Sequence, residues 1–196
     1  FEKNGFIVKL DQFMFTSVCV LLRQWIDAGI EPCPLSVNVS RMQFHTPDFV
    51  ERYIKIKSQY AIPDGLLELE FTESIFFENV ALLSSAVHEL RWAGIKCAID
   101  DFGAGYSSLN VLKALPVSVL KLDGMFFRTA KDDEQAKIVI RNIMRMAADL
   151  KMSTVAEGVE THEQVAFLET TGCDIIQGYV FARPMPAAEF TGLLEG

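Results

Sequence analysis

Two adjacent aspartates, Asp100 and Asp101, end a short apolar run and precede a loop that contains glycines, in the sequence AIDDFGAGYSS (98–108). Neighbouring carboxylates repel each other unless a cation lies beside them. Taken alone, an Asp-Asp pair at a strand end is more often part of a turn or a helix cap than a metal site. The pair alone therefore leaves two interpretations open, a solvated turn and a metal site.

Other apolar runs in the chain end in similar polar side chains, all of which bear oxygen ligands or a positive charge: Asn38, Glu70, Lys121, Asp123, Glu157 and Gln177. The carboxylates and the amides form an oxygen ligand set that suits Mg²⁺ or Mn²⁺ better than zinc. Clustered carboxylates can hold two cations roughly 3.5 to 4 Å apart, which activates a water against a phosphodiester. Lys121 would either offset their charge and orient a hydroxide or form a structural salt bridge.

Glu68 and Glu70, in the sequence LLELEFTES, are two residues apart and so point to the same face of a strand. Carboxylates that face a buried interior are costly without a cation. The alternative is an exposed edge strand with a solvated glutamate face. By the same alternation, we expect Asp100 to point inward with Ala98 and Asp101 to lie at the rim.

Short β-rich runs alternate with longer helical patterns along the chain, which is typical of parallel strands covered by helices. Thr161 and Ser107 are expected N-caps of helices, and Gly94 and Gly172 are expected to follow helix ends. We predict strands at 35–40, 66–73, 96–101, 119–123, 153–157 and 174–179, and helices at 11–28, 47–60, 80–93, 107–114, 132–150, 161–170 and 186–194.

The position of the polar residues distinguishes the two architectures that fit this order, a doubly wound open sheet and a (β/α)8 barrel. An open sheet gathers ligands from a few strands at a switch point, whereas a barrel collects the ends of all its strands at one mouth. Every predicted strand ends in a candidate ligand, which favours the barrel. Because a barrel of this type has eight strands, the six runs predict an α/β, TIM-like barrel whose first two strands are missing from this chain.

The bulk properties narrow the function classes. The formal net charge of −8 over 196 residues argues against a nucleic-acid duplex as the partner, since duplex binding draws on clustered basic residues. The four cysteines form no CxxC pair and predict reduced thiols in a cytoplasmic protein. We expect no membrane-spanning segment and no signal peptide in the chain. The three histidines, His45, His88 and His162, are interpreted as surface or packing residues.

Six sequence blocks, in this order, closely resemble the EAL domain family: SVNVS (36–40), ELEFTES (68–74), AIDDFGAGYSSL (98–109), VLKLDG (119–124), VAEGVET (155–161) and DIIQGYVFARPMP (174–186). The resemblance covers essentially the whole chain. It implies a bacterial phosphodiesterase with a TIM-like barrel that cuts cyclic di-GMP to linear pGpG with Mg²⁺ or Mn²⁺. The family also includes members that bind the dinucleotide without cutting it.

Carried over position by position, the resemblance implies roles for ten residues. Asn38, Glu70 and Asp100 become metal ligands, and Asp101 serves a second ion. Lys121 and Glu157 become the pair that positions and deprotonates the attacking water. Gln177 would lie beside the ions or the ligand phosphate, Asp123 and Glu160 would support the site, and Glu73 would anchor the loop at 101–108.

The resemblance also implies features outside these residues. The Glu-Ala-Leu sequence that names the family would precede Phe1, and its glutamate would be a further metal ligand. We expect residues 1–196 to be a single EAL-type domain, incomplete at its N-terminus, in a homodimeric, multidomain signalling protein that other domains could anchor to a membrane. Two alternatives stay open: a module that binds cyclic di-GMP or a protein without hydrolysis, and an enolase-like barrel with Lys121 as base.

Overall fold

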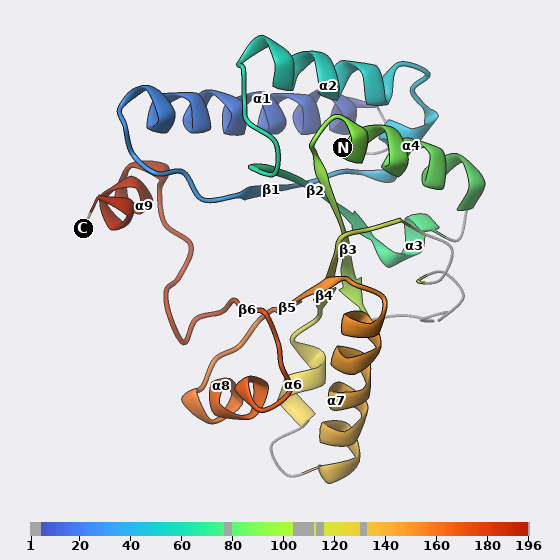
Figure 1. Ribbon diagram of the computed structural model, residues 1–196, viewed down its shortest axis with the longest axis vertical. Helices are drawn as coiled ribbons and strands as arrows, with labels where there is room; N and C mark the ends of the chain where they lie inside the picture. Colours follow the sequence, from blue (N-terminus) through green and yellow to red (C-terminus); the bar gives the residue numbers. More distant parts are fainter. Residues whose placement is uncertain (1–4, 77–79, 104–111, 113–115, 130–132, 196) are drawn as a thin grey trace. The chain divides into compact units, whose positions relative to one another are not determined.

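The computed structural model describes residues 5–76, 80–103, 112, 116–129 and 133–195 (Figure 1). The chain forms two compact units. Unit 1 comprises Phe1–Phe71, Ala81–Cys97 and Met185–Gly196, and unit 2 comprises Thr72–Val80 and Ala98–Pro184. Each unit is described by itself.

Unit 1 combines two parallel strands with helices from both ends of the chain. Strand β1 (Leu35–Asn38) pairs with β2 (Leu67–Thr72) in a register that places Asn38 opposite Glu70. Figure 1 shows α1 and α2 running alongside each other. The elements are α1 (Phe6–Asp27), β1 (Leu35–Asn38), the 3-10 helix η2 (Arg41–His45), α2 (Phe49–Gln59), β2 (Leu67–Thr72, which ends in unit 2), α4 (Val80–Trp92, which begins in unit 2) and α9 (Ala187–Leu194).

The core of unit 1 lies against one face of α1. Phe15, Cys19, Leu22 and Trp25 recur every three or four residues, so they fall on one side of the helix, and each is at most 2% exposed. The Trp25 Nε1–H donates to the hydroxyl of Thr191 on α9 at 2.8 Å. The last helix of the chain is therefore fixed to the first.

A buried carboxylate, Asp11, ties α1 to the chain that leaves β1. Asp11 Oδ2 accepts hydrogen bonds from Ser40 N (3.1 Å), Ser40 Oγ (2.6 Å) and Gln43 Nε2 (3.2 Å). These donors offset the desolvation of an ionised group that is only 7% exposed. The network fixes the backbone two residues after Asn38.

Unit 2 repeats a strand-then-helix pattern, and its strands pair in parallel in chain order. β3 (Lys96–Phe102) pairs with β4 (Val119–Leu122), β4 with β5 (Ser153–Ala156), and β5 with β6 (Ile175–Ile176). Ala98, Val119 and Val155 form a buried apolar layer on one face of three of these strands. The elements are α3 (Glu73–Phe76), β3 (Lys96–Phe102, which begins in unit 1), β4 (Val119–Leu122), α6 (Met125–Thr129), α7 (Glu134–Asp149), β5 (Ser153–Ala156), α8 (His162–Glu169) and β6 (Ile175–Ile176).

Side-chain hydrogen bonds fix the ends of several elements in unit 2. Thr161 and Gln164 form a reciprocal capping box at the start of α8, as predicted for Thr161. Asp133 caps α7 by accepting from the backbone N–H of Gln135 and Ala136. At the start of β5, Asp174 Oδ2 accepts from Thr154 N (2.7 Å) and Thr154 Oγ1 (2.9 Å). These contacts set where each strand and helix begins.

The described elements confirm the six predicted strands and correct several boundaries. The first helix begins at Phe6 rather than at 11, η2 precedes the helix expected at 47–60, and β6 is only two residues long. Glu73 begins α3 instead of ending a strand. The short helices α3 and α6 were not predicted because they are too short to show a helical period. Of the helix expected at 107–114, only Leu112 is described, and it is helical and buried; the expected N-cap Ser107 lies outside the described residues.

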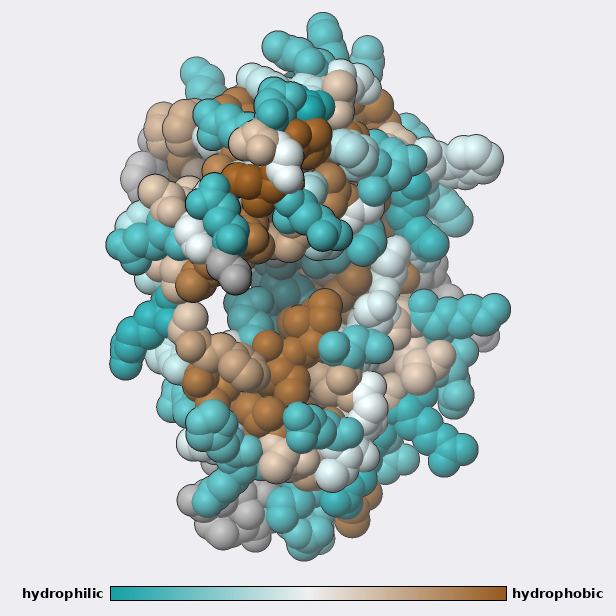
Figure 2. Space-filling view, turned by 60° about the vertical axis from the view of Figure 1, so that its left-hand side comes forward, coloured by the Kyte–Doolittle hydropathy of each residue, from teal (hydrophilic) through white to brown (hydrophobic). Residues whose placement is uncertain are grey.

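The surface carries apolar residues among hydrophilic ones, as Figure 2 shows on one face. In unit 2, Ile175, Tyr179 and Phe181, on and after β6, are each more than half exposed. Among the described helices, none is both long enough and apolar enough to span a membrane.

Candidate functional site

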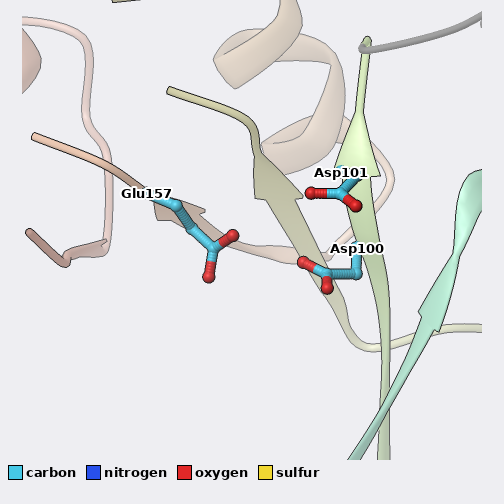
Figure 3. Close-up of side chains that lie close together, drawn as sticks. All are labelled: Asp100, Asp101 and Glu157. Carbon is cyan, nitrogen blue, oxygen red and sulfur yellow. The ribbon is translucent and has the colours of Figure 1, made fainter. Parts of the chain in front are cut away.

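Three carboxylates of unit 2 converge at the carboxyl ends of its strands. Asp100 and Asp101 come from β3, and Glu157 directly follows β5. One oxygen from each lies within 4.8 Å of the other two. Figure 3 shows both aspartates pointing from β3 toward Glu157. The cluster brings together three of the ten residues assigned from the sequence.

A β-bulge in β3 explains how two consecutive side chains point the same way. Ile99 pairs with Leu120 and Phe102 with Leu122, so Asp100 and Asp101 together lie opposite a single residue of β4. Asp101 has a φ of +54°, in the left-handed region that L-residues seldom adopt. Asp101 is more exposed than the buried Asp100, as expected for a residue at the rim, but its carboxylate joins the same cluster instead of pointing to the opposite face. Strict alternation along a strand does not hold across a bulge.

The residue of β4 opposite the bulge is Lys121, which is 5% exposed. Its Nζ lies 2.7 Å from Glu157 Oε1 and 3.2 Å from Asp100 Oδ1. The alternation that points Ala98 and Val119 into the apolar layer also points Asp100 and Lys121 to that face, as expected. Lys121 on β4 thus forms ion pairs with a carboxylate of β3 on one side and with the carboxylate that follows β5 on the other.

The composition of this cluster fits a divalent metal ion. The three carboxylates outnumber the single Lys121 ammonium, so the cluster has an excess of negative charge. Because the cluster is partly buried, a cation beside it would offset the repulsion between the carboxylates. Asp100 Oδ1 is buried and accepts no hydrogen bond from the described residues, although it is ion-paired with Lys121. Carboxylate oxygens are the ligands preferred by Mg²⁺ and Mn²⁺. The donor set therefore matches the cofactors expected from the sequence.

The chain that leaves β3 is held by Glu73, the first residue of α3. Glu73 is 6% exposed, and its Oε2 accepts the backbone N–H of Gly103 at 3.2 Å. This contact agrees with the expected anchoring of the loop at 101–108, of which 104–108 lie outside the described residues. The carboxylate thus fixes the backbone two residues after Asp101.

The three residues expected to support the site or its ligand have different surroundings. Asp123 Oδ1 accepts the backbone N–H of Met125 at 2.7 Å, so this carboxylate caps the start of α6. Glu160 and Gln177 are exposed. The Gln177 backbone continues from β6 beside β5, donating to Ala156 O at 2.8 Å. Among the described residues, the group of mutually close carboxylates contains neither Asp123 nor Glu160.

The two expected metal ligands of unit 1 are register partners. Asn38 ends β1, is exposed, and lies opposite Glu70 in the parallel pair. Glu70 is 5% exposed, which excludes a solvated glutamate face at this position. The histidines are exposed, in agreement with their interpretation as surface residues. Cys19 and Cys97 are buried free thiols, whereas Cys33 and Cys173 are partly exposed.

Comparison with known proteins gives consistent matches over nearly the whole chain. Residues 1–184 match the family model described as EAL domain. The chain is 35% identical over 188 residues to the bifunctional diguanylate cyclase/cyclic di-GMP phosphodiesterase MucR of Pseudomonas aeruginosa, covering 96% of this chain and 27% of MucR. It is 36% identical over 194 residues to the cyclic di-GMP phosphodiesterase NbdA of the same species, covering 99% of this chain and 25% of NbdA. The chain thus spans about a quarter of the length of these relatives.

Solved structures show the same fold. The EAL domain of Mycobacterium smegmatis DcpA superposes with a TM-score of 0.90 at 32% identity, covering 96% of this chain and 85% of that one. The PaMucR phosphodiesterase in complex with c-di-GMP superposes with a TM-score of 0.89 at 35% identity, covering 96% and 76%. Both superposed chains therefore share the fold over 96% of this chain.

Proposed function

Since this chain belongs to the EAL domain family, we propose that it is a metal-dependent phosphodiesterase that hydrolyses cyclic di-GMP to linear pGpG. The fold class of the family, the α/β TIM-like barrel, is the one predicted from the strand-end residues. Curated relatives named as cyclic di-GMP phosphodiesterases support the reaction class. A related structure that contains c-di-GMP supports the ligand.

The observation that carries the proposal is the position of Lys121 between two carboxylates. Lys121 Nζ lies 2.7 Å from Glu157 Oε1 and 3.2 Å from Asp100 Oδ1, and Asp101 joins the same cluster. A structural salt bridge would need only one carboxylate beside Lys121, whereas Lys121 pairs with two carboxylates and Asp101 lies in the same cluster. A site for a phosphodiester needs ligands that hold cations and a group that accepts a proton, and the carboxylates of this cluster can fill both roles.

We assign Asp100 and Asp101 as metal ligands in unit 2, and Asn38 and Glu70 as metal ligands in unit 1. Mg²⁺ or Mn²⁺, when bound, supplies Lewis-acid polarisation of the phosphate and lowers the pKa of a water. The bulge brings both aspartates to one side of β3, and we propose that each serves a different ion. Gln177, Asp123 and Glu160 are assigned to ligand binding or support of the site, and Glu73 to the loop.

Glu157 is the proton acceptor in the proposed reaction. Its carboxylate, held in place by the Lys121 ammonium, takes a proton from the attacking water. The water oxygen forms a bond to phosphorus while one P–O ester bond breaks, and the leaving oxygen takes up a proton from the solvent. Opening one of the two phosphodiester linkages of the ring yields linear pGpG. Lys121 orients the water and stabilises negative charge on the attacking oxygen.

The wider context is part of the same proposal. We propose that residues 1–196 form one EAL-type domain of a longer bacterial signalling protein that acts in the cytoplasm as a homodimer. The small share of each curated relative that this chain covers supports a multidomain context. The formal charge of −8 supports a ligand reached through bridging cations rather than a nucleic-acid duplex.

A hydrolysis assay tests the proposal, with cyclic di-GMP as substrate and the purified full-length protein that contains residues 1–196 as enzyme. With cyclic di-GMP and Mg²⁺ we expect pGpG, measured by liquid chromatography. Asp100→Asn and Glu157→Gln keep side-chain size but remove a ligand charge and the proton acceptor, and they should lower the rate by about 10²- to 10⁴-fold. Glu169→Gln, the same change at the exposed end of α8, is the matched control and should leave the rate unchanged.

Three outcomes would contradict the proposal. Unchanged turnover in Asp100→Asn and Glu157→Gln would remove the carboxylate cluster from the chemistry. Calorimetric binding of cyclic di-GMP with no product would instead favour a binding module. Failure to bind any cyclic dinucleotide would favour the enolase-like interpretation, with Lys121 as base.

A further inference from the structure

We infer that Phe126 is a positioning residue that holds the bulged end of β3 so that Asp100 and Asp101 face Glu157. The role of these carboxylates as metal ligands rests on the proposed function. The packing of Phe126 is a separate observation about residues that lie entirely within unit 2. Phe126 lies in α6, a helix that the sequence did not predict.

The contact that carries the inference joins Phe126 to Gly103. Gly103 has a φ of +95°, so this turn strongly favours a residue without a Cβ. A Cβ added to Gly103 would lie 2.0 Å from Cε2 and 2.2 Å from Cζ of Phe126. The aromatic ring therefore occupies the space that a side chain at position 103 would need, and it packs directly against the backbone there.

Gly103 is held from a second direction as well. Its backbone N–H donates to Glu73 Oε2, while the Phe126 ring lies where its Cβ would project. Asp101, two residues earlier, has a left-handed φ of +54°. Such a conformation persists only where the surroundings impose it. Glu73 and Phe126 together supply that constraint immediately after the bulge.

Phe126 is itself fixed to the strands that carry the rest of the cluster. Asp123, at the end of β4, accepts the backbone N–H of Phe126 at its carbonyl and of Met125 at its carboxylate. From α8, Gln164 Nε2 donates to Phe127 O at 3.2 Å. Through the Phe126 ring, the end of β3 therefore packs against a helix that is hydrogen-bonded to the end of β4, the strand that carries Lys121.

The first test measures Mn²⁺ affinity of the whole protein by electron paramagnetic resonance and calorimetry. Residues that orient metal ligands typically change metal affinity by about 10- to 100-fold when replaced, and we expect a loss of this size in Phe126→Ala. Phe181→Ala removes the same ring from an exposed position in unit 2 and should bind Mn²⁺ as the unchanged protein does. Phe126→Leu keeps apolar volume without a flat ring and should be intermediate.

The second test needs no metal. Removal of the ring frees the turn at 103, so the Gly103 amide should exchange with deuterium at least about 10-fold faster in Phe126→Ala, because exchange follows local opening. A mutant cycle completes the test: Gly103→Ala collides with the ring, and part of its effect on Mn²⁺ affinity should disappear in the Gly103→Ala, Phe126→Ala double variant.

The outcomes separate this inference from the proposed function. If folded Phe126→Ala and Phe126→Leu keep the Mn²⁺ affinity of the unchanged protein, the inference is overturned and the proposed function stands. If the unchanged protein binds no Mn²⁺, the proposed function fails, and faster exchange of Gly103 would still support the positioning of the turn. Equal Gly103 exchange with and without the ring would overturn the positioning role directly.

Discussion

Replacement of Lys121 by methionine tests how much the positive charge of Lys121 stabilises the fold through its ion pairs with the carboxylate cluster. The Lys121 side chain is 7% exposed and pairs with Asp100 (11% exposed) and Glu157 (19% exposed). Methionine fills a similar volume but removes the positive charge from between these groups. Without metal, Asp100, Asp101 and Glu157 then repel each other within 4.8 Å.

The size of the effect follows from the burial of the pairs. Removal of one partner from a buried ion pair costs about 3 to 5 kcal/mol. Glu157 keeps some contact with water, so we expect a loss at the lower end, about 3 kcal/mol of unfolding free energy. For a chain of 196 residues, this corresponds to a fall in Tm on the order of 10 °C.

Thermal unfolding in a metal-free buffer and in Mg²⁺ measures this prediction. An ion that binds only the folded chain adds about 2.7 kcal/mol when its concentration is 100 times its Kd. Mg²⁺ should therefore restore most of the lost stability in Lys121→Met, and should raise the Tm of this variant more than that of the unchanged chain. Lys137→Met is the matched control, because Lys137 pairs with Glu134 on the surface of α7 and its loss should not change the response to Mg²⁺.

An unchanged Tm in metal-free Lys121→Met would refute the electrostatic reasoning. So would a lowered Tm that Mg²⁺ does not raise, because the cluster would then lack the excess negative charge that attracts a divalent cation.

Three further predictions concern stability. Asp11→Ala removes three hydrogen bonds to a buried carboxylate and should lower the unfolding free energy by about 3 kcal/mol in urea titrations, whereas Asp27→Ala on the same helix, in an exposed pair with Arg23, should change it little. Asp174→Ala leaves the backbone N–H of Thr154 without its partner and should cost about 1 kcal/mol with catalytic turnover retained; a loss of turnover would show that β5 is coupled to Asp174. Burial raises the pKa of Cys19 and of Cys97 from 9.0 to about 12, so the unfolded chain releases protons that the folded chain retains, and stability should fall as the pH rises between these values; Cys97→Ala should flatten this slope of Tm against pH.

Much of the fold could be predicted because its determinants are local. The six residues 119–124 are enough to show the alternation that places Val119 and Lys121 on one face of the strand. The capping box of Thr161 involves only the residues up to Gln164. From the sequence alone, Asp100, Lys121 and Glu157 are therefore predicted to lie at the ends of neighbouring strands, and the structure pairs Lys121 with both carboxylates.

The features that were missed depend on partners far away in the sequence. The bulge at Asp100 and Asp101 is a mismatch of register with β4, which a single strand cannot reveal. The positioning role inferred for Phe126 depends on its contact with Gly103, and the cap that Asp11 gives to the chain after β1 crosses 29 residues. The aspartate at position 101 is a weak clue in the sequence to the positive φ found there, since aspartate tolerates the left-handed region better than most residues.

The tie between Trp25 and Thr191 has a consequence for the order of folding. The strands of unit 2 pair with their nearest successors along the chain, as Ala98 does with Val119 and Val155 with Ile175, so their loops close at small entropic cost. Unit 1 needs α9, and its first helix lacks this partner until the ribosome has released residues 187–194. We therefore expect the backbone amides of β4 and β5, which adjoin the acidic cluster, to gain protection from exchange before the Trp25 indole N–H does in pulse-labelled refolding. On the ribosome, the same order would leave nascent chains with paired strands in unit 2 and a first helix that still lacks α9.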